Sequence, residues 1–208
     1  MRIAFFTKMI NARLFTSIFN RHKEDISVLY VFDKSCGKSE FNSVHLYDND
    51  KDNTYEFLLV EKVEVAIIYG WSYKIPVSIL HQIPFYNIHP SLLPLYRGPI
   101  PIIFQILNKE KKGGVTIHKV DENFDTGPIY RQKEILFSNN ENFNSLNLKL
   151  SMCALHLLNE FFIDFKSNNI TLCHQDNKKG SYYSYKDLEK YDFKETLGVT
   201  KDENFNYG

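Results

Sequence analysis

The sequence lacks an excess of charge of either sign, because 25 lysine and arginine residues balance 25 aspartate and glutamate residues. A protein that tracks the phosphates of a nucleic acid needs a broad positive field, and this composition does not supply one. We therefore expect no nucleic-acid partner. The apolar fraction of 43% and the aromatic fraction of 15% are typical of a globular protein rather than a disordered one.

Cysteine and long apolar runs are also scarce. Cys36, Cys153 and Cys173 are odd in number and fit no zinc-binding spacing, so we interpret them as reduced thiols. No other cluster has metal-ligand spacing, and we expect no metal. No apolar run approaches the ~18 residues of a membrane span. The start MRIAFFTKMI turns polar too early for a signal peptide. These absences predict a cytoplasmic protein with no membrane partner.

Four short runs rich in β-branched and aromatic residues predict buried strands, at 2–6, 26–32, 64–70 and 85–89. Segments with helical periodicity lie between them. Strands that alternate with helices predict a Rossmann-like α/β fold, with a mostly parallel central sheet flanked by helices. Ligands on such a sheet bind beyond the carboxyl ends of the strands, and the fourth run ends there with His89.

The second half of the chain predicts a helix near 99–109, strands at 113–120 and 127–137, and a long helix from about 145 to 166. The apolar stripe of the long helix is typical of packing against a sheet. The tail is polar and rich in tyrosine. We expect a main domain over 1–167 and a short C-terminal arm over 168–208, packed on the core or on a second subunit.

Two segments carry residues that chemistry could use. Asn87 and His89 are two positions apart on a strand and therefore share a face. Asp125 lies directly before a Thr-Gly-Pro turn between two later strands. Histidine can take a proton, an asparagine amide can hold an oxyanion, and a carboxylate can orient an imidazole. Purely structural alternatives are that His89 is a hydrogen-bonded histidine of the strand and that Asp125 caps the turn. If the two loops meet, the set suits acyl transfer to an amine.

The segments NIHPSLLPLYRGPIPIIFQIL (87–107) and GGVTIHKVDENFDTGPIY (113–130) resemble the formyltransferases that use N10-formyltetrahydrofolate. The resemblance implies direct attack of an amine on the formyl group, with no covalent enzyme intermediate. It also implies that His89 acts in proton transfer, that Asn87 steadies the formyl oxyanion, and that Asp125 supports His89. The main domain would then be a formyltransferase catalytic domain.

The resemblance also implies where the cofactor lies. The pterin would lie against the loops 69–76 and 120–125, with Gly70, Trp71, Val120 and Asp125 as contacts. Trp71 could equally be a packing aromatic. We interpret His118 as a packed core histidine rather than a cofactor contact.

The acceptor is inferred from features of other family members that this sequence does not share. The segment FTKMINARLF (6–15) has no glycine, which argues against the phosphate loop of the purine-pathway enzyme. A tRNA acceptor would call for a basic C-terminal domain, which we do not find. The chain is most similar to the nucleotide-sugar N-formyltransferases. We expect an amino-dideoxy sugar linked to a nucleotide, dTDP first, and a role in polysaccharide biosynthesis.

Lys8, Asn11 and Arg97 are expected near this acceptor, although Arg97 could instead be an exposed loop arginine in an ordinary salt bridge. Two other functions stay open. One is a formyltetrahydrofolate deformylase, in which water is the acceptor. The other is a non-catalytic module that binds folate or nucleotide. The oligomeric state is open as well, with a homodimer as one expectation.

Overall fold

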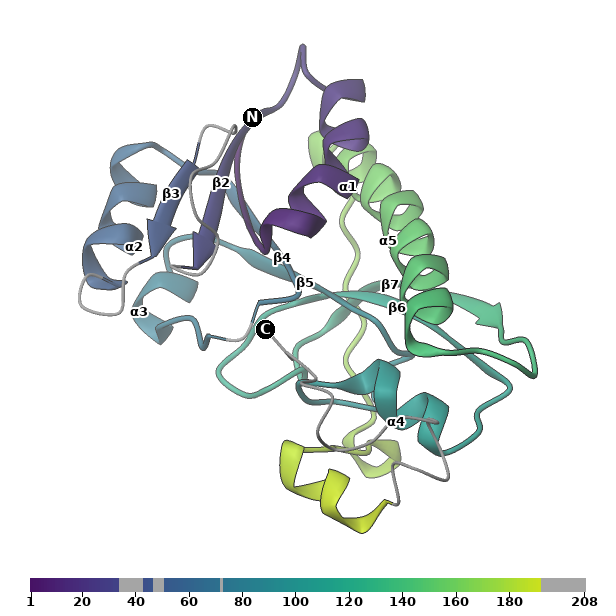
Figure 1. The fold of residues 1–208 in the computed structure, drawn as a ribbon. Helices are drawn as coiled ribbons and strands as arrows, with labels where there is room; N and C mark the ends of the chain where they lie inside the picture. Colours follow the sequence, from purple (N-terminus) through teal and green to yellow (C-terminus); the bar gives the residue numbers. More distant parts are fainter. Residues whose placement is uncertain (34–42, 47–50, 72, 192–208) are drawn as a thin grey trace.

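A computed structural model describes residues 1–33, 43–46, 51–71 and 73–191 of the protein. They form a seven-stranded sheet with helices on both faces (Figure 1). The strands are β1 (Arg2–Thr7), β2 (Ser27–Asp33), β3 (Ser43–Leu46), β4 (Val65–Tyr69), β5 (Phe85–His89), β6 (Lys112–Lys119) and β7 (Ile129–Leu136). The helices are α1 (Met9–Arg21), α2 (Lys51–Val60), α3 (Val77–Leu80), α4 (Pro101–Leu107) and α5 (Phe143–Lys166), followed by the 3-10 turns η2 (Asn177–Lys179) and η3 (Tyr185–Lys190).

The strand order is β3-β2-β1-β4-β5-β6-β7. The first five strands in this order are parallel, whereas β6 and β7 are antiparallel to their neighbours. This confirms the predicted Rossmann-like, mostly parallel sheet. The chain builds outward from β1 in both directions, so the sheet has a switch point between β1 and β4. Ligands of doubly wound sheets bind at the carboxyl ends of strands beside such a point.

Two apolar layers bury the sheet, and β1 contributes to both. Ile3 and Phe5 belong to the cluster shared with α1 and α5, while Ala4 and Phe6 belong to the cluster shared with α2 and α3. All four side chains are fully buried. A strand covered on both faces is apolar throughout rather than alternating, which explains the continuous runs in the sequence.

The long helix α5 lies along one face of the sheet beside α1 (Figure 1). It begins at a capping box, in which the Asn142 side chain accepts from the Ser145 amide and the Ser145 hydroxyl accepts from the Asn142 amide. Its buried stripe confirms the predicted packing helix and consists of Leu146, Leu150, Ala154, Leu157, Leu158, Phe161 and Phe162. Cys153 is buried on this helix, and Cys173 is exposed; both are free thiols.

The sequence patterns placed six of the seven strands and missed β3. This edge strand has four residues, SVHL, and its mixed polar composition gives no strand signal. Cys36 and the tail 192–208 lie outside the described residues. Within the described residues, none of the helices combines the length and apolarity that a membrane span requires.

The chain after α5 returns to the carboxyl side of the sheet. It forms isolated bridges between Cys173 and Ile129 and between Tyr182 and Arg97. Tyr183 stacks on Phe104 with ring centroids 4.3 Å apart. The described part of the arm therefore packs against the loop after β5, against α4 and against the start of β7. The division at residue 167 stays a prediction.

Candidate active site

Strand β5 delivers Asn87 and His89 to the carboxyl edge of the sheet. It pairs with β4 on one side and with β6 on the other, and Asn87 lies directly across the ladder from His118. Pro90 follows His89 and ends the strand, because proline lacks the N–H that the ladder needs. The antiparallel register therefore adds a second histidine to the predicted pair.

The turn between β6 and β7 brings Asp125 to the same place. Asp125 has a left-handed backbone with φ +56°, a conformation that aspartate and asparagine adopt more readily than most residues. Its Oδ1 accepts from Asn87 Nδ2 at 3.2 Å, and its Oδ2 accepts from the backbone N–H of Gly98 at 2.9 Å. The two predicted loops thus meet at this carboxylate.

Both histidines face this carboxylate and are almost fully buried. His89 Nδ1 lies 3.6 Å from Asp125 Oδ1, and His89 Nε2 donates to the carbonyl of Tyr96 at 2.8 Å. His118 Nε2 lies 3.5 Å from Asp125 Oδ1 and accepts from Asn87 Nδ2 at 3.3 Å, while its Nδ1 donates to the carbonyl of Lys119. We call Asn87, His89, His118 and Asp125 the polar cluster.

Burial and charge set the protonation of the polar cluster. Burial lowers the pKa of His89, although the charge of Asp125 offsets part of this effect. For Asp125, burial opposes ionisation, but the Gly98 N–H and the protonated forms of His89 and His118 favour the carboxylate, and the pKa of the carboxyl lies well below its ordinary value. The resting site therefore pairs a neutral His89 with an ionised Asp125. His89 is then free to accept a proton beside a carboxylate that would stabilise the resulting charge.

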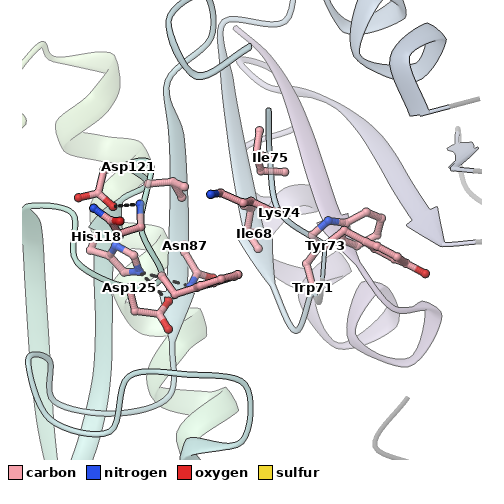
Figure 2. A pocket seen from close by; sticks show the side chains of 12 residues that line it. Ile68, Trp71, Tyr73, Lys74, Ile75, Asn87, His118, Asp121 and Asp125 are labelled. Atoms are coloured by element: carbon pink, nitrogen blue, oxygen red, sulfur yellow. Dashed lines mark hydrogen bonds and ion pairs between the residues drawn. The ribbon is translucent and has the colours of Figure 1, made fainter. Parts of the chain in front are cut away.

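A pocket opens beside the polar cluster and has one polar side and one largely apolar side (Figure 2). Asn87, His118, Asp121 and Asp125 lie together on the polar side. The rest of the lining consists of Ile68, Trp71, Tyr73, Lys74, Ile75, Val120, Asn123 and Phe124.

Trp71 has a double role in this lining. Its ring packs edge-on against Phe6, with centroids 5.3 Å apart, so it is a packing aromatic. Its Nε1 is buried without a hydrogen-bond partner among the described residues. A buried donor without a partner is costly, and a ligand with polar ring edges would satisfy it. The aromatic lining and this unsatisfied donor suit the chemistry of a polar heterocycle such as a pterin.

The other predicted site residues lie at the same edge of the sheet but outside this pocket. Lys8 precedes α1, and Asn11 contacts Gly70: a Cβ at Gly70 would lie 2.9 Å from Asn11 Nδ2. Gly70 has φ +68°, which suits glycine at the sharp turn after β4. Val120, by contrast, lines the pocket, as does Trp71. The roles of all these residues stay predictions.

For Arg97 the alternative of an exposed arginine in a salt bridge is wrong. The residue is only 9% exposed, and its guanidinium donates to the side-chain carbonyls of Gln175 and Asn177. Both acceptors are neutral amides from the C-terminal arm. The guanidinium is thus a structural link between the loop after β5 and the arm.

Sequence reasoning misjudged the surroundings of one residue of this region and missed another. His118 is buried, as interpreted, yet it belongs to the polar cluster rather than to an apolar core. Its place opposite Asn87 depends on the β5–β6 register, which no local pattern shows. Gln175 contacts the Asp125 turn from 50 residues away. A single polar residue in a polar tail gave no signal.

Comparison with known proteins identifies relatives. The formyl transferase family model matches residues 17–160. Methionyl-tRNA formyltransferase of Kosmotoga olearia is 40% identical over 118 residues, which are 57% of this chain and 38% of the relative. The enzyme of the same name from Thermotoga maritima is 39% identical over 135 residues, 64% of this chain and 43% of the relative. The chain thus spans about two fifths of the length of these curated relatives.

Solved structures share the fold over more of the chain. The formyltransferase PseJ of Anoxybacillus kamchatkensis, in complex with UDP-4,6-dideoxy-4-formamido-L-AltNAc and tetrahydrofolate, is 25% identical with a TM-score of 0.70. The match covers 98% of this chain and 93% of that one. A 4-N formyltransferase from Francisella tularensis has a TM-score of 0.76 at 24% identity, covering 91% and 78% of the two chains.

Proposed function

Because the chain belongs to the formyl transferase family, we propose that it moves a formyl group from N10-formyltetrahydrofolate to an amine. The observation that carries this proposal is the meeting of Asn87, His89 and Asp125 in one cluster. Asn87 and Asp125 line the pocket, and His89 lies behind them, against Asp125. These are the three residues that the family resemblance assigns to catalysis.

In the proposed reaction the amine nitrogen attacks the formyl carbon, and the bond from that carbon to N10 of the folate breaks. The bound folate supplies the formyl group and the leaving nitrogen. His89 takes the proton that the amine loses, and this proton ends on N10 of tetrahydrofolate. The Asn87 amide donates to the formyl oxygen as negative charge grows there. Asp125 stabilises His89 while it carries the proton.

For the acceptor we propose an amino sugar linked to a nucleotide. The support is the likeness to PseJ, which extends over nearly the whole of both chains and whose structure holds a UDP-linked formamido sugar. The balanced charge of the sequence also favours a small acceptor over a polyanion. A second candidate is the amine of methionyl-tRNA, favoured by the 40% identity to the Kosmotoga olearia enzyme.

The acceptor proposal predicts release of tetrahydrofolate from N10-formyltetrahydrofolate only when a nucleotide-linked amino sugar is present. The release can be followed spectroscopically against a panel of dTDP- and UDP-linked amino sugars, with methionyl-tRNA as a separate arm. Release with methionyl-tRNA alone would replace the sugar by the second candidate. Equal release without any acceptor would make the protein a deformylase, and no release in any arm would favour the non-catalytic module.

Trp71 provides a direct test of the folate pocket, because it is the one tryptophan in the 208 residues and it lines the pocket. We expect tetrahydrofolate or a stable folate analogue to change the fluorescence of the wild-type protein in a saturable way. A Trp71→Phe variant should lose the signal, and calorimetry should show weaker binding because the indole N–H is gone. Folate binding measured by calorimetry with unchanged tryptophan fluorescence would contradict this pocket.

A further inference from the structure

The backbone of the Asp125 turn is held by a side chain from the C-terminal arm. Gln175 Nε2 donates to the carbonyl of Asp125 at 2.9 Å and to the carbonyl of Gly127 at 2.8 Å. One amide group thereby satisfies two carbonyls of the turn. The first of them belongs to Asp125, the residue with the left-handed backbone. Gln175 lies beyond residues 17–160, which the family model matches.

Arg97 binds the oxygen of the same side-chain amide. Gln175 Oε1 accepts from Arg97 Nε at 3.2 Å and from Arg97 Nη2 at 2.6 Å. The next residue, Gly98, donates its N–H to the carboxylate of Asp125. The loop after β5 therefore contacts Asp125 twice, once directly through Gly98 and once through Arg97 and Gln175.

The backbone around this link is fixed by the arm as well. The Arg97 N–H donates to the Ser181 carbonyl, and the Tyr183 N–H donates to the Arg97 carbonyl, both at 2.9 Å. A Cβ at Gly98 would lie 2.1 Å from the carbonyl oxygen of Tyr183, so this close approach requires glycine. Gln175 is therefore held in two ways: its side chain is hydrogen-bonded to Arg97 and to the turn, and the segment that follows it is hydrogen-bonded to the backbone of Arg97.

We propose that Gln175 is a positioning residue for Asp125, and that Arg97 acts by holding Gln175 in place. The proposal rests on the proposed function, in which Asp125 supports His89. Gln175 does not line the pocket, so its effect on the reaction passes through the turn. Reactions of this kind are sensitive to position: a misplacement of ~1 Å can cost on the order of 10² in rate.

The test compares Gln175→Leu with Asn177→Ala. Leucine removes both bonds to the turn while keeping the bulk of the side chain. Asn177 is exposed and accepts from Arg97 Nη2 at 2.6 Å, yet it does not contact the turn, so it is the matched control. We expect Gln175→Leu to lower kcat by on the order of 10- to 10²-fold with little change in the KM for the folate. Asn177→Ala should change kcat far less.

A double-mutant cycle separates positioning from a general loss of structure. If Gln175 acts through Asp125, adding Gln175→Leu to an Asp125→Asn variant should cost little more, because interacting residues are not additive. Additive losses would overturn the proposal. So would a lower melting temperature with full kcat per folded molecule.

NMR titration of His89 in the ligand-free protein gives a readout that does not depend on turnover. The titratable and charged groups facing His89 are Asp125, His118 and Arg97, and of these Asp125 raises the pKa of His89. Gln175→Leu should lower this pKa as Asp125→Asn does, and should have no further effect in the double variant. If Gln175→Leu changes the pKa of His89 but the wild-type protein transfers no formyl group, the proposed function is wrong and the positioning role of Gln175 is supported. An unchanged titration would overturn the positioning role.

Discussion

The His89→Asn variant is expected to lose roughly 10²- to 10⁴-fold in kcat/KM for formyl transfer, the usual contribution of a positioned general base. Asparagine keeps a polar side chain in a site where His89 is only 4% exposed, but it cannot take a proton at neutral pH. The measurement is the steady-state rate of tetrahydrofolate release with the acceptor identified by the panel. His81→Asn is the matched control, because His81 is exposed and does not line the pocket.

The pH dependence of kcat/KM in the wild-type enzyme should report the protonation of His89. Catalysis needs neutral His89, and burial lowers its pKa from the ordinary value of 6.5. His89 therefore stays neutral as the pH falls through 6.5, and the acid limb of kcat/KM should lie below that pH. The limb should be absent from the residual activity of His89→Asn. Wild-type turnover in that variant, or an acid limb that survives in it, would remove His89 from the reaction.

The Asp125→Asn variant is expected to lose on the order of 10²- to 10³-fold in kcat, as when a preorganised electrostatic group is removed. Asparagine tolerates φ +56° and can still accept from the Gly98 N–H, so the turn should keep its shape. What is lost is the negative charge beside His89. Asp121→Asn is the control, since Asp121 lines the same pocket but accepts from Thr126 and from the Asn123 amide. Equal losses in the two variants would contradict a special role for Asp125.

Asp125 should also contribute to the acid sensitivity of the fold. Its pKa in the folded protein lies below the ordinary value of 3.8, so its ionised form stabilises the fold fully above about that pH. This contribution is lost as the pH falls from 3.8 toward the folded-state pKa. Urea unfolding should therefore show a stability difference between wild type and Asp125→Asn that is constant near neutrality and shrinks in acid. A difference that grew in acid would show that Asp125 is not ionised in the folded protein.

The sequence predicted the parts of the fold that depend on local pattern. The continuous apolar runs of β1, β2, β4 and β5 mark strands buried on both faces, and the stripe of α5 marks a helix with one buried face. The strand β3 was not predicted because its four residues, SVHL, are too few and too mixed in polarity to form an apolar run.

The site was only partly predictable, for a different reason. Asn87, His89 and Asp125 lie in two segments that resemble one enzyme family, and that resemblance implies that the three residues act in one site. His118 depends on the register between β5 and β6, and the Arg97–Gln175 bond joins residues 78 positions apart. Pairings set by tertiary contact leave no periodic trace. Lys8 and Asn11, which we expected near the acceptor, do not line the pocket, whose lining comes from β4, β5, β6 and the segments that follow β4 and β6.

The attachment of the arm also bears on how the protein matures during synthesis. The Tyr96 amide is satisfied by the hydroxyl of Ser181, which is 85 residues further along the chain. At translation rates of about 5–20 residues per second, that stretch takes roughly 4–17 s to make. For this interval the loop after β5 has been synthesised while its hydrogen-bonding partners in the arm have not. The sheet can form first, but the loop that carries Arg97 and Gly98 reaches its final shape only when the arm arrives.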